Sequence, residues 1–339
     1  MDADWRSVIV GFVAAAAILA GLIYVVGADE VFAALAMLET RDFLLLVGAT
    51  SGYLLAWSLA LRTVLSALDV EATLVESVLL FTSATFANNV TPFGQAGGEP
   101  FSALLVARAT DSEYEASLAA IASVDTINFI PSIVLSGLGL AYYLAVFAVG
   151  DQLVPVVAVV LVLALGVPLV GYLVWRFRRR LQRVIVGIVH PITAILGRYV
   201  PSFVAPSRPN IRRRVRGFFT AIERVADSRA TLVEALLFSA MGWGCMALAL
   251  WLALGAVGHA VPIAAALIAA PVGAIASVTP LPGGLGGVEL AVVLIVVPIT
   301  TVTPEIAASA ALVYRGATYW LPTVGGGMAT VFLESRVGR

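Results

Sequence analysis

Long uninterrupted apolar runs constrain this chain more than any other feature. Runs of about 18 residues or more, the length of a membrane span, recur along its 339 residues, of which 60% are hydrophobic and 12% charged. Soluble domains are roughly 45–50% apolar and 25% charged, so this chain cannot cover its apolar runs with polar surface. The runs lack the alternating pattern of membrane barrels. The sequence therefore predicts an all-α, polytopic membrane helical bundle, with residues 1–339 forming one integral membrane domain.

Six of the runs are long enough to cross a membrane as single helices. Because a helix rises about 1.5 Å per residue, roughly 20 apolar residues cross a hydrocarbon core of about 30 Å. The N-terminal run lacks the basic start and short core of a cleaved signal peptide, so we expect it to remain as the first span. The six expected spans are residues 8–26, 43–65, 115–147, 153–175, 231–254 and 306–333.

Two further apolar regions, residues 73–109 and 261–299, are broken by prolines and glycines. Their arms of roughly 11 to 18 residues are marginal or too short to span, so we expect two re-entrant helical hairpins. The alternative is eight full spans. The residues expected at the hairpin tips are Pro92, Gly94, Gly97 and Gly98 in the first region, and Pro280, Pro282, Gly283, Gly284, Gly286 and Gly287 in the second.

The two breaks resemble each other in sequence. Residues 90–99 (the first interruption) read VTPFGQAGGE, and residues 278–289 (the second interruption) read VTPLPGGLGGVE. Each contains Val-Thr-Pro, a glycine pair and a glutamate that is expected to open a helix. Span, hairpin and span in residues 43–147 would then be matched upside down by residues 231–333. Inverted repeats with broken helices that meet near the midplane are a recurring transporter architecture.

The arginines set the expected orientation. Residues 176–230 form an Arg-rich loop with 13 arginines and two acidic residues, whereas residues 27–42 are mainly acidic. The positive-inside rule places the Arg-rich loop and both termini in the cytoplasm. We interpret the loop as a topology determinant with amphipathic segments on the inner leaflet. The alternative is that it binds anionic lipid headgroups or nucleic acid, but the net charge of −1 points to no such partner, and we expect no nucleic acid.

Ionisable side chains follow both interruptions at the same spacing. Asp125 lies 26 residues after Glu99, and Arg315 lies 26 residues after Glu289, each within the next span. Charges at this depth are costly and usually face a polar cavity or one another, so we expect these four residues to form a substrate-binding site. The amides that are expected to line the site or to satisfy backbone freed at the helix breaks are Asn88, Asn89, Gln95 and Asn128.

The chain offers little for metal or nucleophile chemistry. Cys245 is the single cysteine, and His190 and His259 lie in different predicted loops, which argues against a disulfide framework and most zinc or haem sites. The chain has no lysine, so it has no nucleotide-binding loop of the Gly-x-x-x-x-Gly-Lys type. We therefore expect no metal, no cofactor and no enzymatic activity.

Three strings resemble a known family. They are residues 88–108 (NNVTPFGQAGGEPFSALLVAR), 280–289 (PLPGGLGGVE) and 312–322 (LVYRGATYWLP). They look like signatures of the flippase-like family that includes the transmembrane region of lysylphosphatidylglycerol synthases. The resemblance covers almost the whole chain and implies a membrane protein that moves lipid-linked headgroups between leaflets, or assists in doing so. It marks Glu99, Glu289 and Arg315 as motif positions. Many relatives carry a basic residue soon after the first glutamate, where this chain has residues 100–102, Pro-Phe-Ser.

Residues and resemblance together favour a lipid or lipid-linked headgroup flippase in the cell membrane. We expect the headgroup to pass through a polar groove between the two hairpin tips, where helices beginning near Gly98 and Val288 and the Arg315 side chain would attract phosphate. Glu289 is expected to pair with Arg315, and the role of Glu99 stays open between headgroup, proton and structure. The expected partners are membrane lipids or a lipid-linked saccharide. Because lipid-synthesising relatives carry an additional cytoplasmic domain, we expect any headgroup synthesis to need a separate enzyme.

Other functions stay open at this stage. A non-lipid solute or ion-coupled transporter would fit the same inverted-repeat plan. An intramembrane lipid-modifying enzyme would use the glutamates and the aspartate as acid and base. A structural membrane subunit would use its polar tips for packing alone. The sequence leaves the oligomeric state and the energy source open.

Overall fold

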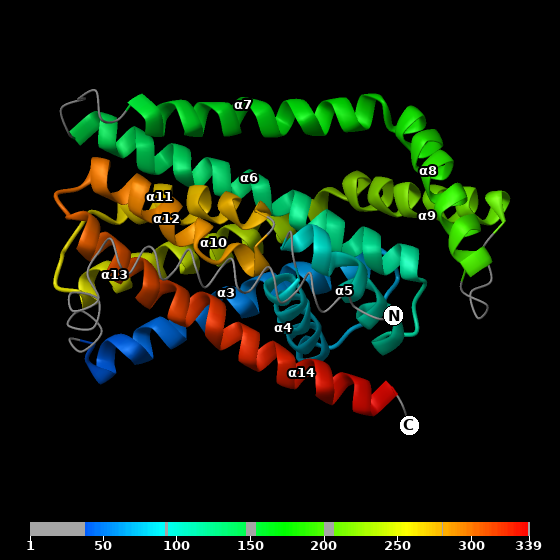
Figure 1. Ribbon diagram of the computed structural model, residues 1–339, viewed down its shortest axis with the longest axis horizontal. Helices are drawn as coiled ribbons and strands as arrows, with labels where there is room; N and C mark the ends of the chain where they lie inside the picture. Colours follow the sequence, from blue (N-terminus) through cyan, green and yellow to red (C-terminus); the bar gives the residue numbers. More distant parts are fainter. Residues whose placement is uncertain (1–37, 92–93, 147–153, 200–206, 280, 338–339) are drawn as a thin grey trace.

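Every regular element in the described part of the protein is helical. The computed structural model describes residues 38–91, 94–146, 154–199, 207–279 and 281–337. Within these ranges the α-helices, labelled as in Figure 1, are α3 (Thr40–Ala67), α4 (Leu74–Val90), α5 (Gln95–Ala109), α6 (Tyr114–Val146), α7 (Val154–Arg176), α8 (Arg178–Tyr199), α9 (Arg208–Asp227), α10 (Arg229–Ala256), α11 (Ile263–Ile275), α12 (Gly287–Ile299), α13 (Pro304–Arg315) and α14 (Leu321–Val337). Shorter turns are the 3-10 turns η2 (Ala276–Val278) and η3 (Pro282–Gly284) and the π-helical turn η4 (Gly316–Trp320). The all-α prediction is confirmed.

Five segments of the described chain are long and apolar enough to cross a membrane, namely α3, α6, α7, α10 and Pro282–Ile299. The first four coincide closely with predicted spans. The fifth joins η3 to α12, and because Gly283 within it lies at φ 54°, it is not one continuous helix. Helix α12 itself has 13 residues, as expected for a hairpin arm. The predicted first span, residues 8–26, lies outside the described residues.

The last predicted span, residues 306–333, is not one regular α-helix. It consists of α13, η4 and α14, so a π-helical turn begins directly after Arg315. In a π turn the backbone bonds are displaced by one residue from the α pattern. At this turn the carbonyl of Thr318 accepts a hydrogen bond of 3.1 Å from the hydroxyl group of Tyr53 on α3. A partner from a distant helix thus supports the irregular backbone.

Each broken region forms two short helices that pack against each other, α4 with α5 and α11 with α12. Helix α4 begins with a capping box, in which the Thr73 hydroxyl accepts the N–H of Glu76 and the Glu76 carboxylate accepts the N–H of Thr73. In Figure 1 the α4–α5 pair lies toward the end of the bundle that carries α8 and α9, and α11 and α12 extend from the opposite end.

The start of α5 differs from the sequence prediction. The helix begins at Gln95 rather than near residue 99, because Gly94 turns the chain at φ 54° and ψ −121°, a conformation open to glycine. Gly97 and Gly98 therefore belong to the first turn of α5, and their N–H groups donate to the Gly94 carbonyl at 3.1 and 3.0 Å.

In the second interruption the chain follows the expected path more closely. Pro282, Gly283 and Gly284 form η3, Gly286 precedes α12, and Gly287 is its first residue. The predicted tip residues Pro92 and Pro280 lie outside the described residues.

The two interruptions contact one another. A Cβ atom placed on Gly94 would lie 2.8 Å from the carbonyl oxygen of Ser277, and one placed on Gly283 would lie 3.1 Å from the Cα atom of Asn89 and would overlap the ring of Tyr319. Only residues without a side chain permit this approach. The sequence therefore places its glycines where two backbones meet inside the bundle.

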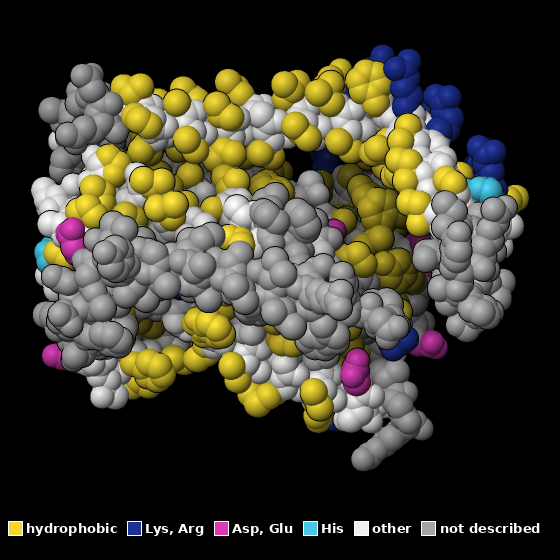
Figure 2. Space-filling model, in the orientation of Figure 1, with side chains coloured by type: hydrophobic (Ala, Val, Ile, Leu, Met, Phe, Trp, Pro, Cys, Tyr) yellow, Lys and Arg dark blue, Asp and Glu magenta, His cyan; other side chains and the backbone are white. Residues whose placement is uncertain are grey.

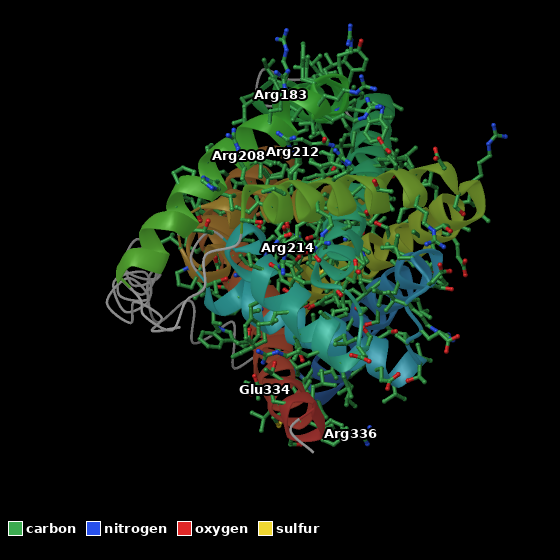
Figure 3. The ribbon with its side chains drawn as sticks, turned by 90° about the vertical axis from the view of Figure 1, so that its right-hand side faces the viewer. Arg183, Arg208, Arg212, Arg214, Glu334 and Arg336 are labelled. Atoms are coloured by element: carbon green, nitrogen blue, oxygen red, sulfur yellow. The ribbon has the colours of Figure 1, made fainter. Side chains whose placement is uncertain are left out.

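The charged residues lie mainly at one end of the bundle and the apolar ones along its sides. Figure 2 shows hydrophobic side chains along α7, where the Leu165 side chain is 72% exposed, and arginines at the end formed by α8. Figure 3 looks onto this end, with Arg183 on α8, Arg208 and Arg212 on α9, and Arg336 near the end of α14. Ion pairs of α9 with the loop after α3 and with the start of α6 fix this end of the bundle.

We predict that Gly283→Ala destabilises the protein. The added methyl group would meet Tyr319 and Asn89 at a backbone angle that alanine rarely adopts, and such strain costs about 1–3 kcal/mol. The melting temperature of purified protein, followed by tryptophan fluorescence, should therefore fall. The matched control is Gly244→Ala on α10, where a Cβ meets no atom within 4 Å. Equal melting temperatures for the two variants would contradict the proposed close packing.

Candidate functional site

A cavity of about 220 Å³ lies where the two interruptions meet the long helices. Gly94 and Gln95 contribute to its wall from the first interruption, and Ser277, Gly283 and Val288 contribute from the second. Side chains of α3, α4, α6, α10, α11 and α13 complete the lining. The cavity is therefore the place where both broken regions come together.

Most of the predicted site residues reach this cavity. Those that line it are Asn88, Asn89, Gln95, Asp125, Asn128 and Arg315. Glu99 and Glu289 do not line it. Each glutamate instead contacts a charged residue that does, Glu289 with Arg315 and Glu99 with Asp125. Among the described residues of the lining, Arg315 and Asp125 are the charged ones.

Arg315 is held by three contacts. Its Nε donates to Oε1 of Glu289 at 3.1 Å, its Nη2 donates to the carbonyl of Gly283 at 2.7 Å, and its guanidinium lies 4.4 Å from the ring centroid of Tyr319. Glu289 is 1% exposed and the Arg315 side chain 11%. A buried charge needs such partners, because an unpaired one is very costly. The pairing predicted between Glu289 and Arg315 is present.

Part of the Arg315 guanidinium stays available to a ligand. Arginine has five N–H groups, and among the described residues no hydrogen bond is made by Nη1. Because Arg315 lines the cavity, these donors are the strongest positive group that a molecule in the cavity can meet. The site can therefore bind an anion without breaking the pair with Glu289.

The π-helical turn η4 is tied to α4 on the other side of Arg315. The Tyr319 hydroxyl donates to the carbonyl of Asn89 at 3.1 Å, and Asn89 Nδ2 donates to Thr323 Oγ1 at 2.8 Å and to the carbonyl of Tyr319 at 3.4 Å. Asn89 thus satisfies backbone at an irregular turn, which is one of the two roles predicted for the amides. It also fixes the ring on which Arg315 lies.

The side of the cavity formed by α5 and α6 is rich in acceptors. Gln95 Nε2 donates to Oδ1 of Asp125 at 3.4 Å, and the Asp125 carboxyl group is within hydrogen-bonding reach of Glu99. Three buried oxygens have no partner among the described residues, Oδ2 of Asp125 and Oδ1 of Asn88 and Asn128. The cavity therefore has a cationic side at Arg315 and an acceptor side at Asp125.

Aromatic residues form a wall that the sequence analysis missed. The Trp57 ring lies 5.2 Å from Tyr53, 6.0 Å from Phe81 and 5.4 Å from Trp243, measured between centroids. Trp243 Nε1 also donates to the carbonyl of Asn128 at 2.9 Å. The available signal was tryptophan and tyrosine deep inside predicted spans, since their polar atoms need partners there.

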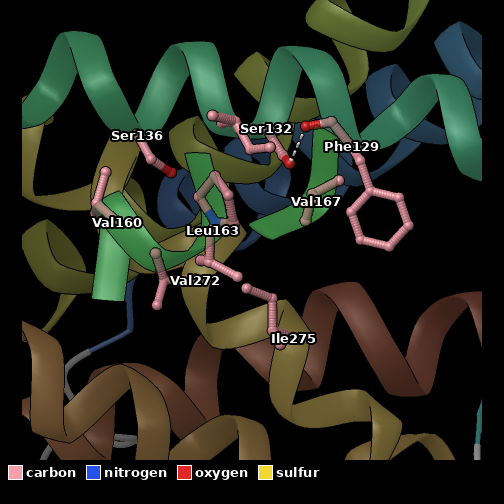
Figure 4. Close-up of a pocket in the computed structure, with 10 residues that line it drawn as sticks. Phe129, Ser132, Ser136, Val160, Leu163, Val167, Val272 and Ile275 are labelled. Carbon is pink, nitrogen blue, oxygen red and sulfur yellow. Dashed lines mark hydrogen bonds between the residues drawn. The ribbon is translucent and has the colours of Figure 1, made fainter. Parts of the chain in front are cut away.

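A smaller pocket adjoins the cavity on the side of α7. It encloses about 20 Å³ between α6, α7 and α11 and shares four lining residues with the cavity, Phe129, Ser132, Pro271 and Ile275. Figure 4 shows Val160, Leu163 and Val167 of α7 around it, and the Ser132 hydroxyl bonded to the carbonyl of Phe129. The cavity therefore comes close to a helix whose outer face is apolar and exposed.

We predict that Arg315→Gln lowers the free energy of unfolding by about 3–5 kcal/mol, because it leaves Glu289 buried without its partner. The double variant Arg315→Gln/Glu289→Gln removes both charges and should melt at a higher temperature than the single variant. Thermal unfolding of the purified proteins measures this order. Simple addition of the two single losses in the double variant would show that the charges are not coupled.

Comparison with known proteins agrees with the geometry. Residues 8–326 match the family described as the lysylphosphatidylglycerol synthase TM region. Two UPF0104 membrane proteins of Methanothermobacter thermautotrophicus are 24% identical over 335 residues, covering 96% of this chain and 93% of the relative, and 25% identical over 355 residues, covering 97% and 95%. A UPF0104 membrane protein of Pyrococcus horikoshii is 22% identical over 281 residues, covering 81% and 82%. The chain is thus a polytopic membrane protein, and it belongs to the family of the lysylphosphatidylglycerol synthase transmembrane region.

Proposed function

We propose that this protein moves the polar headgroup of a lipid, or of a lipid-linked saccharide, across the cell membrane. The observation that carries the proposal is the cavity between the two interruptions, which presents Arg315 and Asp125 inside an otherwise apolar bundle. A headgroup crossing bare hydrocarbon loses its hydration and gains nothing in return. A polar cavity replaces that hydration with fixed partners.

The positive side of the cavity suits a phosphate group. The first residues of α5 and the Val288 segment of α12 line it, and helix N-termini present free N–H groups that favour anions. Nη1 of Arg315 adds a charged donor, and guanidinium matches phosphate geometry well. Glu289 lies in the first turn of α12 and takes up part of this positive field, which leaves a site of moderate charge that can also release its ligand.

The size of the cavity favours a headgroup over a whole lipid. Sites that enclose complete drug-sized ligands have volumes of roughly 300–1,000 Å³, and this cavity has about 220 Å³. The acyl chains would therefore stay outside, in the bilayer. The small pocket beside α7 in Figure 4 is the side from which we propose that the lipid approaches.

The proposed orientation places the Arg-rich end in the cytoplasm. The arginines of α8 and α9 and Arg336 gather at one end of the bundle in Figure 3, and positive loops are retained inside. Helix α14 ends at the same side, so the C-terminus would also be cytoplasmic. We further propose that residues 43–147 and 231–333 form inverted repeats that rock against each other and expose the cavity to each leaflet in turn.

The test is transport in reconstituted vesicles. Purified protein in liposomes with fluorescent lipids of several headgroups, read by leaflet-selective quenching, should accelerate transbilayer movement of at least one of them. Rates no faster than those of protein-free vesicles, across several headgroups and ion gradients, would refute the proposal. Transport of soluble solutes without lipid movement would indicate a solute transporter, and a changed lipid in the product would indicate an enzyme.

We predict that Arg315→Gln reduces the transport rate at least about tenfold, the effect of losing a charge-assisted hydrogen bond of about 1.5 kcal/mol or more. The double variant Arg315→Gln/Glu289→Gln should be equally slow although it is the more stable of the two, which separates transport from folding.

The matched control is Arg178→Gln. Arg178 also makes a 3.1 Å Nε contact with a glutamate, Glu223, and also lies over an aromatic ring, Trp175, but at the surface of the protein. It should transport at the wild-type rate. Equal loss in both variants would remove Arg315 from the transport site.

A further inference from the structure

The two charged residues of the cavity are each backed by a glutamate, but the two pairs differ in charge. Glu289 and Arg315 stand 26 residues apart and form a neutral ion pair. Glu99 and Asp125 stand at the same spacing after the first interruption, and both are acids. The second pair therefore lacks the positive charge that balances the first.

No cation among the described residues supplies this charge. The ion pairs of the described chain do not include Glu99 or Asp125. Gln95 donates one hydrogen bond to Asp125 Oδ1, and across the cavity Arg315 is already bonded to Glu289. Two carboxylates in contact cannot both ionise without a counter-charge and hold one proton between them.

Unsatisfied oxygens independently point to a missing donor at this place. Oδ2 of Asp125 is buried without a partner, and a proton on it would turn it into a donor within reach of the Glu99 carboxylate. One turn further along α6, Asn128 is 8% exposed, lines the cavity, and its Oδ1 is also without a partner among the described residues. Buried acceptors without donors are rare and costly.

We propose that Asp125 and Glu99 form a proton-binding site that opens into the cavity through Asp125. The site holds one proton as an O–H···O⁻ bond between the two carboxyl groups, in the position that the Arg315 guanidinium takes in the other pair. Loss of this proton to the cavity leaves two adjacent negative charges. If the proposed lipid transport is correct, on which this step depends, proton uptake and release here couple headgroup movement to a proton gradient.

We predict that dicyclohexylcarbodiimide labels Asp125 or Glu99 in the intact purified protein at neutral pH, and that labelling declines as the pH is raised. The reagent adds the O–H of a protonated carboxyl group across its N=C bond, and the product rearranges to a stable N-acylurea that peptide mass spectrometry locates. Glu289 is the internal control, because it is equally buried but ionised by its pair with Arg315. It should stay unlabelled in the wild type and become labelled in Arg315→Gln.

A second measurement does not depend on access of the reagent. The infrared carbonyl band of a protonated carboxylic acid should be present in the wild type at neutral pH and absent in Asp125→Asn/Glu99→Gln, with tryptophan fluorescence used to confirm that the variant is folded. Absence of this band in the wild type would overturn the proposal, whatever the labelling shows. Labelling of Glu289 in Arg315→Gln, with none at Asp125 or Glu99 in the wild type, would also overturn it.

The coupling step has its own readout. In vesicles an imposed pH gradient should change the wild-type transport rate severalfold and leave the rate of the double variant unchanged. A wild-type rate that ignores the gradient would overturn the coupling. A proton site without any lipid transport would refute the proposed function and leave the site itself intact.

Discussion

The Arg315–Glu289 ion pair holds together the parts of the protein that form its cavity. Glu289 belongs to the first turn of α12, Arg315 ends α13, and the same guanidinium bonds to the Gly283 carbonyl in the second interruption. Inside an apolar bundle neither charge can exist alone at low cost. Each therefore fixes the position of the other, and both fix the backbone turn that meets Asn89 on α4.

The chemical difference between the halves of the cavity follows from this constraint. In one half a fixed cation neutralises the buried glutamate, so the site offers permanent donors. In the other half an aspartate stands where the arginine would be expected, and the neighbouring amides contribute oxygens without partners. One side therefore has a constant charge, and the charge of the other side depends on what occupies it.

Much of the fold could be predicted from the sequence, because a membrane span needs a long apolar run and a break needs proline or glycine. The long helices α3, α6, α7 and α10, the two broken regions and the pairing of Glu289 with Arg315 follow from such patterns. The early start of α5 could not be predicted, since Gly97 and Gly98 look like tip residues until Gly94 is seen to make the turn. The aromatic wall around Trp57 and the π-helical turn depend on contacts between residues far apart, such as Tyr53 with Thr318, which local sequence does not reveal.

The π-helical turn also has a geometrical consequence for the last two helices. An α-helix advances about 100° per residue, and a π turn carries roughly one residue more than an α turn. The face of α14 that packs on α4 is therefore displaced around the axis from the face that a straight continuation of α13 would present. The register of the C-terminal helix is set by this offset, and without it Thr323 would not meet Asn89.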